Sequence, residues 1–130
     1  METSVQVFAM VNLLVVGLSH LTQPRAWVDF FVWLRERGNA GAFVNGFLSL
    51  GFGSIVVAFH DVWSGIPMIL TIYGWALVLK ALITFTLPGL ARRSLQRVSP
   101  ATTGKCVVAG ALLVVFGGLL AYSLLTGGQP

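Results

Sequence analysis

The stretch CVVAGALLVVFGGLLAYSLL (Cys106–Leu125) contains no charged residue and no proline. At 1.5 Å per residue, a helix of about 20 residues crosses the roughly 30 Å hydrocarbon core of a bilayer. Three further apolar runs occur, so the predicted spans are about residues 5–21, 40–59, 66–87 and 106–125. None alternates as a barrel strand does, and backbone amides in lipid must pair internally. The sequence predicts an all-α, four-transmembrane-helix bundle forming one integral membrane domain, 1–130.

The composition supports this fold class. Hydrophobic residues make up 56% of the 130 residues and charged residues 9%, whereas a soluble domain has about 25% charged residues. The net charge is +4, but the basic residues lie in connections between apolar runs. This arrangement indicates a lipid bilayer rather than nucleic acid as the partner. The N-terminus lacks the basic region of a signal peptide, so we expect the first apolar run to remain in the protein.

The connections between the spans indicate the orientation. Lysine and arginine are absent from both termini and from the second connection. The first and third connections contain Arg25, Arg35, Arg37, Arg92, Arg93, Arg97 and Lys105. Because basic connections stay in the cytoplasm, both termini are predicted on the outer, periplasmic side of a bacterial inner membrane.

The first connection contains an amphipathic segment, at about residues 24–37. Trp27, Phe30, Phe31 and Leu34 follow helical spacing, and Pro24 suits a helix start. We expect an interfacial helix in the cytoplasmic headgroup layer with its aromatic rings toward the acyl chains. Packing against a partner protein is the alternative.

The segment PGLARRSLQRV (88–98) has a similar but weaker pattern. Its arginines and the one that follows Pro24 are candidate contacts for anionic lipid headgroups at the cytoplasmic face. These candidates are Arg25, Arg92, Arg93 and Arg97.

A shift of 64 positions superimposes features of the two halves of the chain. Pro24 then meets Pro88, and Gly46 meets Gly110. Each half has two spans, so a duplication would be parallel, with a pseudo-twofold axis along the membrane normal. Chance similarity between apolar helices is the alternative.

Small residues form stripes on the second and fourth predicted spans. In membranes such stripes let helix backbones approach closely. They could pack inside the monomer or bind another chain. The candidate packing residues are Ala42, Gly46, Ser49, Gly53, Gly110 and Gly117.

Lys80 is the one lysine or arginine inside a predicted span. It lies seven residues before Leu87, about 10 Å from the cytoplasmic end of the third span. Its stem could extend to the cytoplasmic phosphates. Alternatively, Lys80 points inward to His20 and Asn45 and forms a polar pocket for an anionic headgroup, a quinone carbonyl or a carboxylate of another subunit.

The outer loop HDVWSGIP (60–67) contains a second candidate site, formed by His60, Asp61 and Trp63. Histidine beside an acid could handle protons. The alternative is a polar helix end with an interfacial tryptophan.

Other chemistry finds little support. The single cysteine, Cys106, excludes internal disulfides and multi-cysteine metal sites. His20 and His60 are predicted at opposite membrane faces, too far apart to ligate one haem. The predicted spans contain no carboxylate, which argues against ion-coupled transport. We therefore predict no catalytic residue, metal or cofactor.

The stretch His60–Pro88 follows the pattern H-[DN]-x-W … T-x-x-G-W-x-x-x-x-K, ending in proline. The matching residues are His60, Asp61, Trp63, Thr71, Gly74, Trp75, Lys80 and Pro88. This pattern resembles that of small uncharacterised bacterial four-span integral membrane proteins, and the outline alone is DoxX-like. The resemblance implies a bacterial inner-membrane protein and no particular activity.

Three functions are hypotheses at this point. The leading one is a non-catalytic accessory or structural subunit that binds lipid. Its protein partner would be a larger membrane protein or further copies of the same chain. The second is a small oligomeric transporter or channel for a neutral or anionic solute. The third is a quinone- or redox-associated membrane protein.

Overall fold

The fold is that of a computed structural model, which describes residues 1–97 and 103–126. It consists of α1 (Glu2–Thr22), α2 (Pro24–Glu36), α3 (Asn39–Phe59), α4 (Pro67–Thr86), α5 (Pro88–Gln96) and α6 (Thr103–Leu125). Helices α1, α3, α4 and α6 are long and apolar enough to cross a membrane. The predicted all-α, four-span architecture is therefore confirmed. The short helix α2 follows the first span as expected, and α5 occupies the equivalent place after the third.

Proline determines where the two short helices begin. Pro24 and Pro88 occupy the first turns of α2 and α5, where proline's fixed φ and missing N–H cost little. Each follows a single non-helical residue, Gln23 with φ −132° and Leu87 with φ −131°. A residue before proline is pushed out of the helical region by the proline ring. The chain therefore turns sharply at both places, and each short helix crosses the end of the preceding span.

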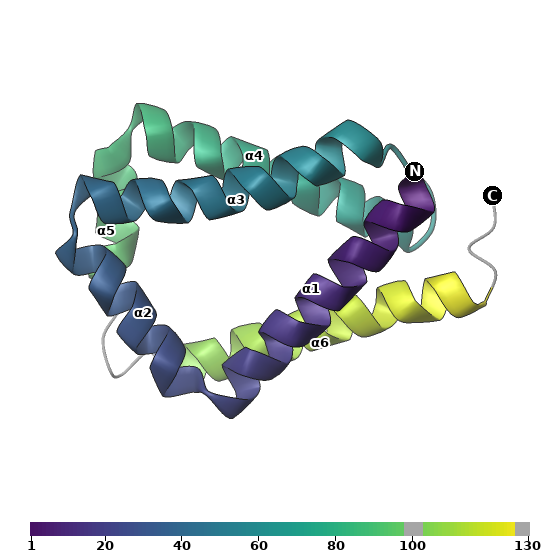
Figure 1. Cartoon of the computed structure of the whole chain (residues 1–130), viewed down its shortest axis with the longest axis horizontal. Coiled ribbons are helices and arrows are strands. Elements are labelled where there is room, and N and C mark those ends of the chain that lie inside the picture. The colour runs from purple at the N-terminus through teal and green to yellow at the C-terminus, as the bar shows by residue number, and fades with distance from the viewer. Residues whose placement is uncertain (98–102, 127–130) are drawn as a thin grey trace.

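The four long helices form two antiparallel pairs. Helix α1 packs mainly on α6, and α3 packs mainly on α4. Figure 1 shows the pairs close together near the N-terminus and far apart at the opposite end, where α2 and α5 connect them. The end of the bundle where the pairs meet, which holds the N-terminus, is called the outer end, and the half of the bundle next to it the outer half, after the side on which the sequence predicts them.

Glycine contacts inside the two pairs repeat at the offset of 64 positions. A Cβ built at Gly46 would lie 2.9 Å from Thr84 Cγ2, and one built at Gly110 would lie 2.7 Å from His20 Cβ. Thr84 and His20 are themselves 64 positions apart. The α3–α4 and α1–α6 contacts are thus related by a pseudo-twofold arrangement, as a parallel duplication requires.

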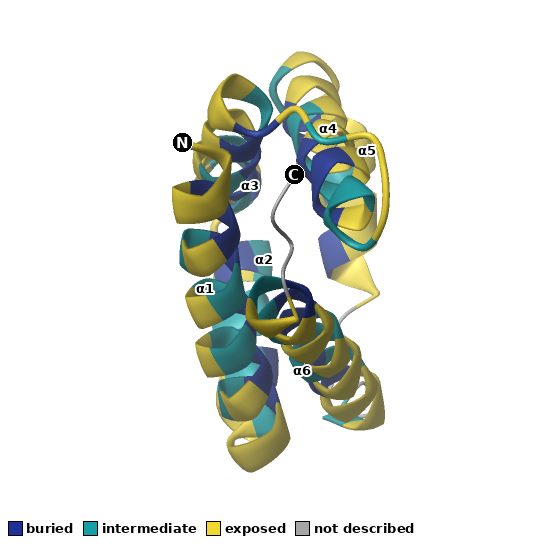
Figure 2. Cartoon of the chain, turned by 90° about the vertical axis from the view of Figure 1, so that its right-hand side faces the viewer, coloured by how far each residue is buried: buried dark blue, intermediate teal, exposed yellow. Residues whose placement is uncertain are grey.

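The side chains between the pairs fill the outer half of the bundle. One core cluster contains Val5, Ala9, Leu13, Val56, Leu70 and Leu120. Beside it, four rings, one from each long helix, make successive contacts with centroids 5.4–6.0 Å apart: Phe8, Phe52, Tyr73 and Phe116. Figure 2 shows the buried positions on the sides where helices face each other and the exposed ones around the outside. The outer half is therefore closed by packed side chains.

A second cluster joins the short helices to the bundle at the other end. Leu34 of α2, Ala42 of α3 and Leu95 of α5 are buried together, with Phe31 packed against them. The apolar face of α2 was expected to contact acyl chains, but part of it packs on α3 and α5 instead. The reason is the divergence of the two pairs, which leaves apolar surface that α2 and α5 cover.

Candidate functional site

Lys80 is exposed and lines a pocket of about 580 Å³ at the end of the bundle where the pairs diverge. The lining comes from α3, α4 and α5, and from Phe31 of α2. Besides Lys80, its polar lining residues are Asn45, Thr84 and Ser94. The apolar part comprises Phe31, Ala76, Leu79, Ile83, Leu90, Ala91 and Leu95. The pocket is thus a mainly apolar hollow with one cation.

Three polar side chains of this pocket, those of Lys80, Asn45 and Ser94, have no hydrogen-bond partner among the described residues. The Lys80 ammonium and the Asn45 amide make no hydrogen bond or ion pair there. Thr84, by contrast, donates its hydroxyl to the carbonyl of Lys80, 2.9 Å away, within its own helix. No described lining residue is acidic. The pocket therefore offers donors and a positive charge, the chemistry that suits an anionic group.

A second pocket, of about 300 Å³, adjoins the first. Phe31 and Ser94 line both pockets. The remaining lining residues of the second pocket are His20, Arg97, Lys105, Cys106 and Ala109. This pocket is also basic, and no acidic residue is among its described lining.

His20 therefore does not share the pocket of Lys80 and Asn45. The sequence grouped these three residues, but the structure places His20 on the adjoining pocket beside α6. Its Nδ1 donates to the carbonyl of Val16, 2.8 Å away. Its ring stacks on Trp27 with centroids 4.0 Å apart. Both contacts hold His20 against α1 and α2, while Asn45 and Lys80 belong to the other helix pair.

At the outer end, His60 is buried and bridges two helices. Thr71 Oγ1 donates to the carbonyl of Val62 at 2.7 Å, so the same oxygen must accept from His60 Nδ1–H at 2.9 Å. The other ring nitrogen, Nε2, then accepts from Gln6 Nε2 at 3.2 Å. These hydrogen bonds specify a neutral imidazole protonated on Nδ1. The Gln6–His60 bond also connects α1 with the end of α3.

The surroundings of His60 favour this neutral form. Burial lowers the pKa of His60, and the opposing effects of Glu2 and Asp61, which raise it, are smaller. Gln6 Oε1 is buried and has no hydrogen-bond partner within the described structure. Rotation of that amide would present Oε1 to a protonated ring. The site can therefore accommodate a proton only with rearrangement of Gln6.

The three candidate residues of the outer loop lie in different environments. Asp61 and Trp63 are exposed, and the Trp63 indole donates to the Asp61 carboxylate. His60 instead bonds to Gln6 and Thr71, neither of which was in the predicted site. A signal for Gln6 did exist, because it is an amide within the first apolar run. What could not be read from the sequence was which distant residue it meets.

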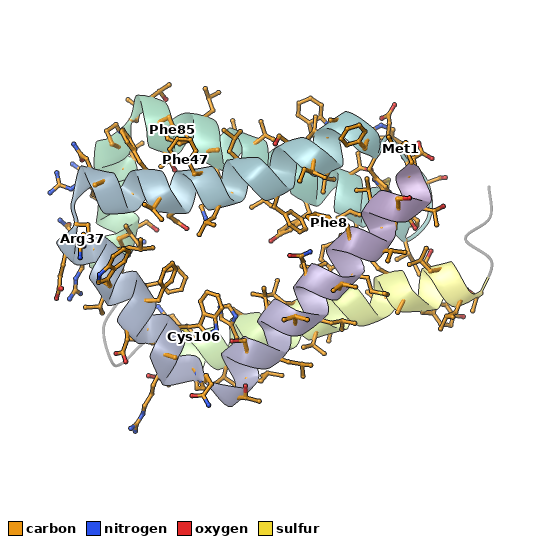
Figure 3. The ribbon with its side chains drawn as sticks, viewed as in Figure 1. Met1, Phe8, Arg37, Phe47, Phe85 and Cys106 are labelled. Carbon is orange, nitrogen blue, oxygen red and sulfur yellow. The ribbon has the colours of Figure 1, made fainter. Side chains whose placement is uncertain are left out.

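The candidate packing stripes lie on helix contacts inside the chain. A Cβ built at Gly53 would lie 2.9 Å from Leu77 Cβ, and one at Gly117 would lie 2.8 Å from Leu14 Cγ. Figure 3 shows Phe47 and Phe85 together on the outside of the α3–α4 pair. All six stripe residues are buried: Ala42, Gly46, Ser49, Gly53, Gly110 and Gly117.

The candidate headgroup contacts remain accessible. Arg25, Arg92, Arg93 and Arg97 are all exposed. Arg37, at the tip of the bundle in Figure 3, lies over the Trp33 ring at 4.5 Å. These cations therefore surround the end of the molecule where α2 and α5 lie.

Within residues 1–97 and 103–126, no group of three or more histidine, cysteine or acidic side chains could hold a metal ion. His20 lies in the last turn of α1, and His60 follows the last residue of α3, at the opposite end of the bundle. No protein-family model, curated protein or solved structure matches this chain.

Proposed function

We propose that this chain is a non-catalytic integral membrane protein that binds an anionic lipid in the Lys80 pocket. The observation that carries this proposal is that one mainly apolar pocket is lined by both the Lys80 ammonium and the Asn45 amide, neither of which has a partner among the described residues. A charge at membrane depth is costly unless it meets water or an opposite charge. A lipid phosphate would supply that charge and accept hydrogen bonds from both groups.

The walls of the pocket favour a lipid over a soluble anion. Leu79, Ile83 and Leu90 line the pocket and are also exposed on the helix surfaces. Their apolar surface continues from the pocket to the outside of α4 and α5, where acyl chains would lie. A headgroup on Lys80 and chains along this surface would satisfy both parts of the site.

The orientation belongs to the same proposal. With α2 and α5 in the cytoplasm, the exposed arginines surround the pocket on the side of the membrane whose surface attracts polybasic segments. Both termini would then lie on the periplasmic side of a bacterial inner membrane. In an accessory role, a larger membrane partner would contact outward faces such as that of Gly118. A Cβ built there would have no neighbouring atom within 4 Å.

Lipid retention tests this function. The protein is purified in mild detergent, exchanged with an anionic or a zwitterionic phospholipid of matched chains, and examined by native mass spectrometry. A surface-near lysine contributes about 1 kcal/mol to the binding of anionic lipid, so Lys80→Leu should weaken anionic binding by about fivefold. Lys80→Arg, which keeps a positive charge in the pocket, is the control and should retain the binding. Equal binding by wild type and Lys80→Leu would contradict the proposal.

One observation favours a second function, transport of an anionic or neutral solute. The outer half of the bundle is packed, while the Lys80 pocket and its neighbour lie at the other end. A carrier open to the cytoplasm would have this asymmetry. Uptake of labelled anions into proteoliposomes tests it, with Lys80→Leu expected to remove any flux. Absence of flux with retained lipid binding would leave lipid binding as the function.

A further inference from the structure

We propose that the two adjoining pockets bind one lipid with two phosphates, one phosphate at Lys80 and the other between Arg97 and Lys105. This inference rests on the proposed function and names its ligand class. A phospholipid in which one glycerol joins two phosphatidyl groups has this chemistry. The second pocket is thus assigned as a phosphate site.

The shared lining shows that the pockets are neighbours. Phe31 and Ser94 contribute to both, so one aromatic ring and one small polar residue separate the two hollows. Phe31 is held by the buried cluster of Leu34, Ala42 and Leu95. A ligand with its centre at Ser94 would therefore have a hollow on either side, with the Ser94 hydroxyl beside its linker.

Each pocket has its own positive charge and no acidic lining residue among those described. Lys80 serves the first pocket, and Arg97 and Lys105 serve the second. Lysine is a point charge that binds phosphate, and arginine adds a planar pair of donors. Two separate cationic sites side by side match a ligand with two separate anionic groups better than a ligand with one.

Part of the lining of the two pockets follows the offset of 64 positions. Thr84 and Asn45 of the first pocket correspond, at the offset of 64, to His20 and Ala109 of the second. Phe31, which lines both pockets, corresponds to Leu95, which lines the first. A lipid whose two phosphatidyl halves are joined by a glycerol has a similar internal symmetry. The equivalence covers part of the pocket walls and not the cations, because Lys80, Arg97 and Lys105 correspond to Val16, Trp33 and Gly41.

Bivalent binding predicts how the affinity depends on each pocket. Once one phosphate is bound, the second binds intramolecularly at a high effective concentration. The two-phosphate lipid should therefore bind at least about tenfold more tightly than a one-phosphate lipid with the same chains. Lys80→Leu and Lys105→Leu should each reduce its affinity to about the one-phosphate level.

Native mass spectrometry of the full chain in detergent tests this inference, using the two-phosphate lipid, the one-phosphate lipid and soluble glycerol bisphosphate as probes. One two-phosphate lipid per chain is the expected result, with a lower affinity in both lysine variants and an unchanged affinity in Ser64→Leu, a substitution in the exposed loop at the opposite end of the bundle. Lys80→Gln repeats the test without adding an apolar side chain, and circular dichroism checks that each variant keeps its helices.

The other outcomes separate the two proposals. Equal affinity for both lipids, or two one-phosphate lipids bound as tightly per chain, would overturn the two-phosphate inference and leave lipid binding intact. Tight binding of soluble glycerol bisphosphate would overturn the lipid as the source of the phosphates. If Lys80→Leu changes the binding of no lipid, both proposals fail.

Discussion

At the scale of single residues, three buried polar groups determine how the outer end responds to pH. His60 is held neutral by accepting from Gln6 and donating to Thr71. Because burial lowers its pKa below the ordinary value of 6.5, the unfolded chain binds a proton more readily than the folded protein. Stability contributed by this site is therefore complete above pH 6.5 and is lost as the pH falls through the lowered pKa.

The first prediction concerns the loss of stability as the pH falls. The thermal unfolding temperature of the purified protein in detergent should fall between pH 7.5 and pH 5. Gln6→Glu should reduce that fall, because a carboxylate accepts a hydrogen bond from the protonated ring. Thr3→Glu, which adds an acid on an exposed neighbouring position of α1, is the control for charge alone. An equal fall in wild type and Gln6→Glu would show that His60 does not govern the effect.

At the scale of helices, close glycine contacts hold each pair together. A Cβ at Gly110 would lie 2.7 Å from His20 Cβ and 2.8 Å from the Gly17 carbonyl oxygen. Backbone oxygen cannot move aside without shifting α1. On the same helix, a Cβ built at Gly118 would have no neighbouring atom within 4 Å. Gly110 and Gly118 therefore differ in whether the absence of a side chain matters for packing.

The second prediction uses this difference. Gly110→Ala should destabilise the protein by about 1–3 kcal/mol, the usual cost of overpacking. Gly118→Ala should be neutral or slightly stabilising, because alanine is the better helix former. Thermal unfolding in detergent measures both. Equal effects of the two substitutions would contradict tight α1–α6 packing at Gly110.

Periodicity and hydropathy predicted the helices well because length and composition alone determine whether a segment can span a bilayer. The four spans and the amphipathic segment after the first were all recovered, and proline marked the start of α2. Which helices pair could not be predicted, since lipid-facing and protein-facing apolar residues look alike in sequence. For that reason the placement of His20 and the partner of His60 came only from the structure.

At the scale of the whole molecule, two helix pairs meet at one end and diverge at the other, and the short helices α2 and α5 occupy the wider end. This shape places the exposed arginines and both pockets at one end of the bundle. If that face is cytoplasmic, the basic residues lie where anionic lipid attracts them. The orientation of the chain therefore determines whether the proposed site can meet its ligand.

The third prediction concerns that orientation. In a Cys106→Ala background, Ser64→Cys in the outer loop should react with a membrane-impermeant thiol reagent in intact bacterial cells. Gln96→Cys, at the end of α5, should react only after the membrane is permeabilised. Ser64 and Gln96 are both exposed in the structure, so local burial does not bias the comparison. The reverse labelling pattern would place α2 and α5 outside the cell.

A structure of the protein determined with its co-purified lipids would show directly whether Lys80 binds a lipid phosphate. The expected result is a phosphate within hydrogen-bond distance, about 3 Å, of both Lys80 Nζ and the Asn45 amide, inside the pocket formed by α3, α4 and α5. A Lys80 side chain directed to the bulk headgroup layer, with a neutral lipid in the pocket, would contradict the binding of an anionic lipid at Lys80.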